Sequence, residues 1–490
     1  MKIVFLEPAS PAVHVYKKMA LPRTGPLYLG TILKNAGHDV RVYSEDIKVP
    51  EVGVFRDADV VALSPVTATA PRAYEYATWL RKMGVKTIIG GPHVSFMPEE
   101  GLEYADVVAI GEGENMVLPL MEALEGKREL SDVPGIAYLV DGKMHKTEPV
   151  KPLMDLDELP TIDFSLLQGG LQKGFYSTIV PVMTSRGCPF NCSFCAVTKM
   201  FGRKYRFRSP GKVIEDLRAM PRSAVRHVFF YDDHLTAHRE RSREMMERMI
   251  KEGFRFTSSA QVRTELGKDP ELLALMRKAG VETVYVGLES INPETLKSYN
   301  KGQTVDEIRD ALASFHRAGI RVHGMFVFGS DNDTVDTIRE TVRFAKKNKI
   351  ESLQFMVLTP LPGTEFYHQL ESEGRLATKY WALFDGHHVT YEPKRMTPYE
   401  LQSETFRAMR DFYSLWDCSK SIMKFKFVDA AIRFYARGMV KSWIKSNRHY
   451  LDDFRASWRN ALSRIEQDWR NRLVALKSAA IAPMHSLPPA

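Results

Sequence analysis

Three of the chain's four cysteines lie close together, in the segment SRGCPFNCSFC. Cys188, Cys192 and Cys195 have the spacing Cys-x3-Cys-x2-Cys, whereas Cys418 lies far along the chain with no second cysteine nearby. Clustered thiolates are typical ligands of zinc or of iron–sulfur clusters. A closed site of either kind needs a fourth ligand. Three cysteines therefore predict a metal site with one position open to a substrate or cofactor.

Two alternatives for the cysteines involve no open position. They could be buried core residues, or they could hold structural zinc together with a histidine such as His227 or His234. The close spacing and a predicted strand directly before them argue against a core role. So few cysteines in 490 residues also argue against a disulfide framework.

The cysteine loop follows the first of six apolar segments that alternate with helical patterns. The segments are 176–185, 227–233, 255–262, 283–290, 321–329 and 353–360, and most end in polar residues. Repeated strand–helix units predict a parallel sheet with right-handed crossovers. Six units in place of eight predict a partial (β/α)6 TIM barrel that is open on one side. In such folds the active site lies at the carboxyl ends of the strands.

Strands and helices also alternate in the first third of the chain. Polar or glycine-rich turns follow three of these strands, at 64–69, 90–93 and 111–113. This pattern predicts a doubly wound, Rossmann-like domain that binds a ligand at its strand ends. We therefore expect an α/β protein with four parts: a Rossmann-like domain at 1–135, a hairpin around Asp141-Gly142 and a linker at 136–175, the partial barrel at 176–391, and a helical C-terminal region at 392–490.

The cysteine loop on a six-unit barrel resembles the radical SAM superfamily over residues 176–390. The resemblance implies a [4Fe–4S] cluster on the three cysteines, with S-adenosylmethionine (SAM) chelating the open iron and yielding a 5′-deoxyadenosyl radical. It implies that Phe194 packs on the adenine and that Arg263 pairs with the methionine carboxylate, although Arg263 could instead pair with Glu265 at the surface. The implied SAM-binding residues are Phe194, Tyr231, Asp232, Gln261, Arg263, Glu289 and Leu358.

The N-terminal domain resembles the cobalamin-binding domain of one large radical SAM subfamily, through the segments LYLGTILKNAGHDV, GGPHVSF and AIGEGE. The Asp-x-His-x-x-Gly motif, whose histidine ligates cobalt in many other corrinoid proteins, is absent. A domain that kept the fold and lost the corrin is therefore an alternative. The implied cobalamin-binding residues are Ser64, Thr67, Thr69, Gly90, Gly91, His93, Gly111, Glu112 and Gly113; Gly90 and Gly91 would permit close approach of the corrin.

Together these resemblances imply a cobalamin-dependent radical SAM enzyme. The expected reaction is methylation of an unactivated carbon, with methylcobalamin as methyl donor and two SAM molecules used per turnover. Radical cyclisation, rearrangement or carbon–carbon coupling are alternatives with the same architecture. A methylthiotransferase is disfavoured because residues 1–175 contain no cysteine. A non-catalytic corrinoid or SAM-binding regulator is disfavoured because the cysteine triplet is intact. No catalytic base is implied.

The C-terminal region interleaves basic and aromatic residues between positions 420 and 448. Such a helix either packs on the barrel with a solvated basic face or makes peripheral contact with an anionic membrane. No recognised nucleic-acid-binding module accompanies the +8 net charge, so we expect no nucleic-acid partner. We expect a cytoplasmic protein, with membrane association as the alternative. The expected partners are a small-molecule or lipid-like substrate and an external electron donor such as flavodoxin or ferredoxin.

Overall fold

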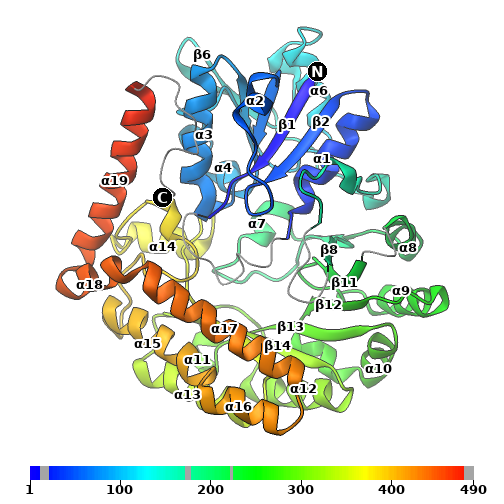
Figure 1. Ribbon diagram of the computed structural model, residues 1–490, viewed down its shortest axis with the longest axis vertical. Coiled ribbons are helices and arrows are strands. Elements are labelled where there is room, and N and C mark those ends of the chain that lie inside the picture. The colour runs from blue at the N-terminus through cyan, green and yellow to red at the C-terminus, as the bar shows by residue number, and fades with distance from the viewer. Residues whose placement is uncertain (11–20, 172–177, 221–224, 479–490) are drawn as a thin grey trace.

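The computed structural model describes residues 1–10, 21–171, 178–220 and 225–478. Within them, two largely parallel sheets are followed by a helical C-terminal region (Figure 1). Tyr176 and Ser177 of the first predicted barrel strand lie outside the described residues. The last residues of the predicted linker, 172–175, and the tail at 479–490 also lie outside the described residues.

The first sheet has the strand order β2-β1-β3-β4-β5-β6-β7. Its five parallel strands are β1 (Lys2–Glu7), β2 (Asp39–Ser44), β3 (Val60–Leu63), β4 (Lys86–Ile89) and β5 (Val107–Ala109). They are connected by α1 (Thr24–Asn35), α2 (Val52–Arg56), α3 (Ala70–Lys82), α4 (Pro92–Phe96) and α5 (Pro98–Leu102), and α6 (Val117–Leu124) follows β5. The order reverses between β1 and β3, which is the switch point where doubly wound sheets bind ligands. The predicted Rossmann-like fold is confirmed.

The hairpin predicted at Asp141-Gly142 consists of β6 (Ile136–Val140) and β7 (Lys143–Lys146). Both turn residues have positive φ, 48° and 76°, as two-residue hairpin turns of this type require. We expected this hairpin in the connection between the domains. Instead, β6 pairs antiparallel with β5 and extends the first sheet beyond residue 135. An Asp-Gly turn predicts a hairpin, but it does not indicate which strand the hairpin will join.

The second sheet contains six parallel strands in the order β15-β14-β13-β12-β11-β8. They are β8 (Thr178–Val182), β11 (Val225–Phe230), β12 (Thr257–Val262), β13 (Val281–Glu289), β14 (Arg321–Phe328) and β15 (Ser352–Val357). The helices around this sheet are α7 (Val197–Phe201), α8 (Pro210–Ala219), α9 (Arg239–Glu252), α10 (Pro270–Lys278), α11 (Pro293–Ser298), α12 (Val305–Arg317), α13 (Val335–Lys347) and α14 (Glu365–Ser372). β8 and β15 are not paired with each other, so the predicted partial barrel is confirmed.

Side chains alternate along the barrel strands between two environments. In β14, Val322, Phe326 and Phe328 are fully buried, whereas His323, Met325 and Val327 are half-buried. Successive side chains of a strand point to opposite faces, so one face packs on the surrounding helices. The other face lines the inside of the open barrel.

The C-terminal region consists of α15 (Pro398–Phe412), α16 (Leu415–Met423), α17 (Phe427–Ser446), α18 (Arg448–Ala456) and α19 (Trp458–Ser478). Just after α15, the Tyr413 hydroxyl donates to the Leu353 carbonyl (2.6 Å) and accepts from the Leu353 N–H (2.8 Å), which satisfies part of the open edge of β15. α17 buries Trp443, which stacks on Phe406 of α15. α19 returns along α3 of the first domain (Figure 1). The basic helix thus packs on the protein through one face.

Candidate functional site

The three clustered cysteines lie on the loop between β9 (Ser185–Arg186) and α7, beyond the carboxyl end of β8. All three are half-buried. The Cys188 N–H donates to the Gly202 carbonyl (3.2 Å), and the Cys195 N–H donates to the Cys192 carbonyl (3.1 Å). Gly187 has φ +88°, and a Cβ there would collide with the Lys204 carbonyl oxygen. The loop conformation therefore requires glycine directly before the first cysteine.

Burial and nearby charges act on two of the three clustered thiols. Burial raises the pKa of Cys195 to about 12, and the neighbouring thiolates of Cys192 and Cys188 add to this effect. Burial also raises the pKa of Cys192, which the charges of Lys301 and Arg263 partly offset. Binding of a metal must therefore stabilise the thiolates of Cys192 and Cys195, which burial in the protein disfavours.

The donor set fits a [4Fe–4S] cluster better than a single metal ion. Among the described residues, no three His, Cys, Asp or Glu side chains gather tightly enough to hold one ion. In a cubane cluster each thiolate binds a different iron, so its ligands stand further apart. Of the two histidines considered for a zinc site, His227 is held by the hydroxyls of Thr257 (2.8 Å) and Ser259 (2.9 Å), and His234 belongs to no cluster of three possible metal ligands among the described residues.

Asp232 supports the base of the cysteine loop. Its carboxylate is fully buried and accepts from the Thr184 N–H (2.9 Å), the Thr184 hydroxyl (3.1 Å) and the Ser185 hydroxyl (2.6 Å). Burial raises its pKa above the usual value. In this arrangement the predicted SAM contact Asp232 faces the protein. The next residue, Asp233, is exposed.

Asp233 follows Asp232 at the end of the second barrel strand, but it is not among the predicted SAM-binding residues. The residue is exposed, yet desolvation by the surrounding protein raises the pKa of its carboxyl to about 7, and the Asp232 charge raises it further. Its charge also raises the pKa of Cys195, so the carboxylate lies near the cysteine loop. Its position at the end of a barrel strand was the signal that could have identified it.

Arg263 and Glu289 lie near Cys192, because both their charges act on its pKa. Arg263 is buried and donates to Glu265 (3.0 Å) and to the Lys301 carbonyl (2.8 Å). The alternative Arg263–Glu265 pair is thus present, although in a buried position. Glu289 has φ +59° and accepts from the Lys301 ammonium (2.6 Å). Lys301 is a second residue that strand-end reasoning missed, since it follows a helix.

The other predicted SAM-binding residues have different environments. Phe194 packs edge-on against Tyr299, with ring centroids 4.9 Å apart. Gln261, at the end of β12, is half-buried. Leu358 is fully buried, and its N–H donates to the Phe328 carbonyl (2.8 Å). Among this set, Phe194 lies on the cysteine loop itself, and Asp232 bonds to the base of the loop. The charges of Arg263 and Glu289 act on the pKa of Cys192.

Most of the predicted cobalamin-binding residues at the strand ends of the first sheet are engaged by the chain itself. The Thr69 hydroxyl bonds with the Val66 backbone, and both Thr67 and Thr69 are buried. Gly91 has φ +99°, and a Cβ there would lie 2.9 Å from the Pro65 carbonyl oxygen. At Gly90 a Cβ would lie 3.3 Å from the Ala109 Cβ. The glycines are thus explained by the packing of the chain without a ligand. Ser64 is half-buried.

His93 is enclosed where the first domain meets the segment after α14. Its ring has no exposed surface and lies 5.0 Å from the ring centroid of Trp381. Its Nε2 is 3.9 Å from Glu100 Oε1, which also accepts from the Trp381 indole (2.7 Å). In this conformation the ring offers no surface to a ligand.

A buried ion network joins the loop after β5 to the cysteine loop. Glu112 pairs with Arg186 (2.6 Å), which directly precedes Gly187, and with Arg206 of β10 (Arg206–Phe207; 2.5 Å). Arg186 also pairs with Glu114 (2.6 Å). Glu112 was predicted to contact cobalamin, but both its carboxylate oxygens are used in this network. Gly111 and Gly113 pack against Val150 and Leu29.

The carboxyl ends of the two sheets therefore face one another. α7 lies between them (Figure 1). The pKa of Tyr231, at the end of β11, responds to the charges of Arg23 and of Glu7 at the end of β1. Tyr231 is nevertheless 40% exposed, which leaves room for a ligand at the junction. The switch point of the first sheet and the cysteine loop of the barrel border the same region.

Comparisons with known proteins agree with this architecture. A family model described as the radical SAM superfamily matches residues 182–345, and one described as the B12 binding domain matches residues 18–120. An uncharacterized methyltransferase of Pyrococcus horikoshii is 30% identical over 429 residues, which cover 84% of this chain and 92% of that protein. The bacteriochlorophyllide d C-12(1)-methyltransferase of Chlorobaculum tepidum is 29% identical over 365 residues, or 73% of this chain and 75% of the relative.

A further relative has a different named activity. The anaerobic magnesium-protoporphyrin IX monomethyl ester cyclase of Rubrivivax gelatinosus is 28% identical over 472 residues, or 91% of this chain and 83% of the relative. Among solved structures, the cobalamin-dependent SAM radical enzyme OxsB, with aqua-cobalamin and SAM bound, superposes with a TM-score of 0.67 at 15% identity. The match covers 97% of this chain and 80% of OxsB, and it shows a shared fold.

Proposed function

The chain belongs to the cobalamin-dependent radical SAM enzymes, and we propose that it methylates an unactivated carbon of a small-molecule substrate. The observation that carries this proposal is the Glu112–Arg186 contact between the loop after β5 and the cysteine loop. Methyl transfer requires the methyl donor and the hydrogen-abstracting group to reach one carbon. This contact joins the two parts of the chain that would hold them.

When bound, the cluster with SAM supplies the radical that abstracts hydrogen, and cobalamin supplies the methyl group. The chain's own residues hold and orient these groups. Cys188, Cys192 and Cys195 would ligate the cluster, and the Lys301 and Arg263 charges would stabilise the Cys192 thiolate. Enclosure between the two sheets would keep water and oxygen from the reacting carbon.

We propose that SAM lies between Phe194, Tyr231, Gln261 and the Arg263–Glu289 region. The ion pair of Lys301 with Glu289 would orient the Glu289 carboxylate toward a ribose hydroxyl. We propose that cobalamin lies across the turns 64–69, 90–93 and 111–113. Since Glu112 and His93 are engaged by the protein, the backbone of these turns and the Ser64 side chain are the better candidates for contacts. The predicted bounds 1–135, 136–175, 176–391 and 392–490 remain part of this proposal, with the hairpin of the second segment joined to the first sheet.

Radical cyclisation is the second candidate, because the Rubrivivax relative named as a cyclase spans 91% of this chain. The reactions can be distinguished with SAM that carries a deuterated methyl group. The reconstituted holoenzyme would be incubated anaerobically with a reductant and candidate tetrapyrrole or lipid-like substrates. Methylation predicts a product that gains the labelled methyl, together with S-adenosylhomocysteine. Product and 5′-deoxyadenosine without S-adenosylhomocysteine would favour cyclisation.

We further propose a cytoplasmic location and an external one-electron donor of the flavodoxin or ferredoxin type. A donor is required because cleavage of SAM consumes an electron, and beyond the triplet the sequence contains only Cys418. Mixing the oxidised holoenzyme with reduced flavodoxin should bleach the cluster absorbance. No helix among the described residues is long and apolar enough to cross a membrane.

The turn between α16 and α17 suggests peripheral contact with a membrane and a lipid-like substrate. It exposes Met423, Phe425 and Phe427 among the lysines 420, 424 and 426. Apolar side chains beside cations are typical of segments that bind anionic bilayers. Flotation with anionic vesicles tests this contact. A protein that stays unbound at low salt would contradict it.

A further inference from the structure

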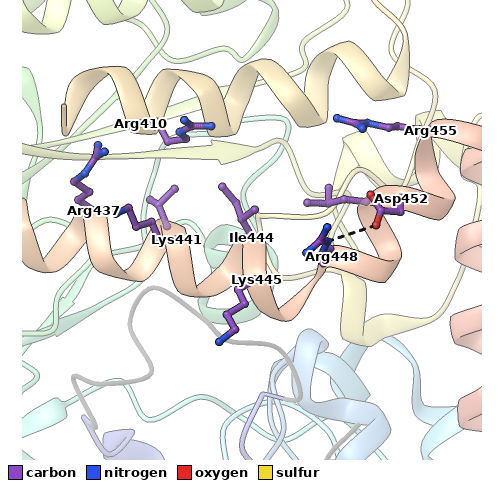
Figure 2. A pocket seen from close by; sticks show the side chains of 10 residues that line it. Arg410, Arg437, Lys441, Ile444, Lys445, Arg448, Asp452 and Arg455 are labelled. Carbon is purple, nitrogen blue, oxygen red and sulfur yellow. Dashed lines mark ion pairs between the residues drawn. The ribbon is translucent and has the colours of Figure 1, made fainter. Parts of the chain in front are cut away.

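An open groove of about 490 Å³ lies between α15, α17 and α18, outside the barrel (Figure 2). Its apolar lining consists of Val440, Ile444 and Leu451. Cationic side chains surround it: Arg410, Arg437, Lys441, Lys445, Arg448 and Arg455. Asp452 is the one acidic residue among those that line it. No residue of the cysteine loop or of the strand ends takes part, so the groove is separate from the candidate active site.

Most of this positive charge has no carboxylate to balance it. Arg448 is 3.8 Å from Asp452, as the dashed line in Figure 2 marks. Across the described ranges, Arg410, Lys441 and Lys445 are not within ion-pair distance of any carboxylate. A ligand that enters the groove would therefore meet several uncompensated cations.

Arg437 lines the groove and is held in place by one hydrogen bond to the protein. One of its terminal nitrogens donates to the Tyr413 carbonyl (3.0 Å), which fixes the guanidinium. Its Nε is buried and makes no hydrogen bond within the described part of the chain. Figure 2 shows this side chain directed toward the space between α15 and α17. The guanidinium is thus held in place while part of its donor capacity stays unused, as expected for an anion-binding residue.

The spacing of the cations on α17 argues against an ordinary solvated face. Arg437, Lys441 and Lys445 follow one another at intervals of four residues, which places like charges side by side on the helix. Such like-charge pairs destabilise a helix. A bound anion would remove this repulsion.

We propose that the groove binds a phosphate group carried on an apolar moiety, such as a phospholipid or another lipid phosphate. Arginine and lysine side chains recognise phosphate oxygens. The apolar lining fits the hydrocarbon part that a free phosphate lacks. The inference rests on this groove alone and is independent of the reaction at the cysteine loop.

The test measures the affinity of the full-length protein for dihexanoyl phosphatidic acid by isothermal titration calorimetry. This short-chain lipid stays monomeric in solution. The variant Arg410→Gln/Lys441→Gln removes two groove cations. The matched control Arg56→Gln/Lys278→Gln removes two exposed cations elsewhere. We expect the wild type and the control to bind equally, and the groove variant to bind at least about tenfold more weakly. Circular dichroism of each variant checks that the fold is intact.

Three results would overturn the proposal. Equal affinity of the groove variant and the control would show that these cations do not bind the lipid phosphate. Equal affinity for inorganic phosphate would show that the apolar lining plays no part. Binding to vesicles that contain phosphatidic acid, without binding of the monomer, would assign lipid contact to the α16–α17 turn instead.

Discussion

Replacement of Glu112 by glutamine should weaken the contact between the two α/β domains. Glu112 balances two buried guanidinium groups, those of Arg186 and Arg206. After the replacement Arg186 keeps Glu114 (2.6 Å). Within the described part of the chain, Arg206 keeps only the carbonyls of Leu153 (2.7 Å) and Phe201 (3.1 Å). A glutamine amide can accept from one guanidinium but turns its NH2 group toward the other.

Loss of one partner of a buried ion pair costs about 3–5 kcal/mol, because the remaining charge stays buried. We expect the free energy of unfolding of the Glu112→Gln variant to fall by this amount. The matched control is Glu252→Gln, which breaks a bidentate pair with Arg218 of similar geometry on the surface. An exposed pair contributes about 0–1 kcal/mol, so the control should change little.

Urea unfolding of Glu112→Gln, Arg206→Gln and the double variant measures the pairing directly. Once Glu112 is gone, removal of the uncompensated Arg206 should cost less than it does in the wild type. We expect the double variant to lose about 1–3 kcal/mol less than the sum of the two single losses. Losses that add within about 0.5 kcal/mol would refute the reasoning, since the two side chains would then be energetically independent.

Three further predictions concern the cysteine loop and the end of β1. Replacing any of the three clustered cysteines by alanine should abolish the cluster absorbance and 5′-deoxyadenosine formation, whereas Cys418→Ala, at a buried thiol on α16, should leave both intact. Gly187→Ala should lower cluster content and thermal stability, because the added Cβ collides with the backbone. The control is Gly253→Ala, where φ is +64° and a Cβ meets open space; it should lower stability by only about 1–2 kcal/mol and leave the cluster content unchanged. Burial raises the pKa of Glu7 from 4.5 to about 7, so the folded state holds a proton that the unfolded state releases, and stability should fall as pH rises from about 4.5 to 7. Glu7→Gln should remove this loss of stability, which amounts to up to about 3 kcal/mol. The replacement should therefore raise the melting temperature more at pH 8 than at pH 5, and an equal change at both pH values would contradict this prediction.

Features encoded by local patterns were predictable from the sequence. The cysteine spacing, the alternation of strands with helices and the Asp141-Gly142 turn each depend on neighbouring residues. They were sufficient to predict the partial barrel, the Rossmann-like sheet and the hairpin.

Features that depend on contacts distant in sequence were not predictable. Glu112 meets Arg186 and Arg206 across 74 and 94 residues, so its motif suggested a ligand contact where the structure has an ion network. His93 is covered by Trp381, which comes from a segment after the barrel. The requirement for glycine at position 91 arises from the Pro65 carbonyl. In each case a sequence motif marked the right region, and tertiary packing decided what the side chain does there.

The most direct test of the account is the stoichiometry of cobalamin on the purified chain. The protein would be reconstituted anaerobically with iron and sulfide, supplied with hydroxocobalamin, desalted and examined by visible absorption. The account predicts one corrin per chain beside an intact cluster, and a Cys192→Ala variant that loses the cluster yet keeps the corrin. An intact cluster without bound corrin would contradict the proposed methyl transfer and leave only the radical SAM barrel.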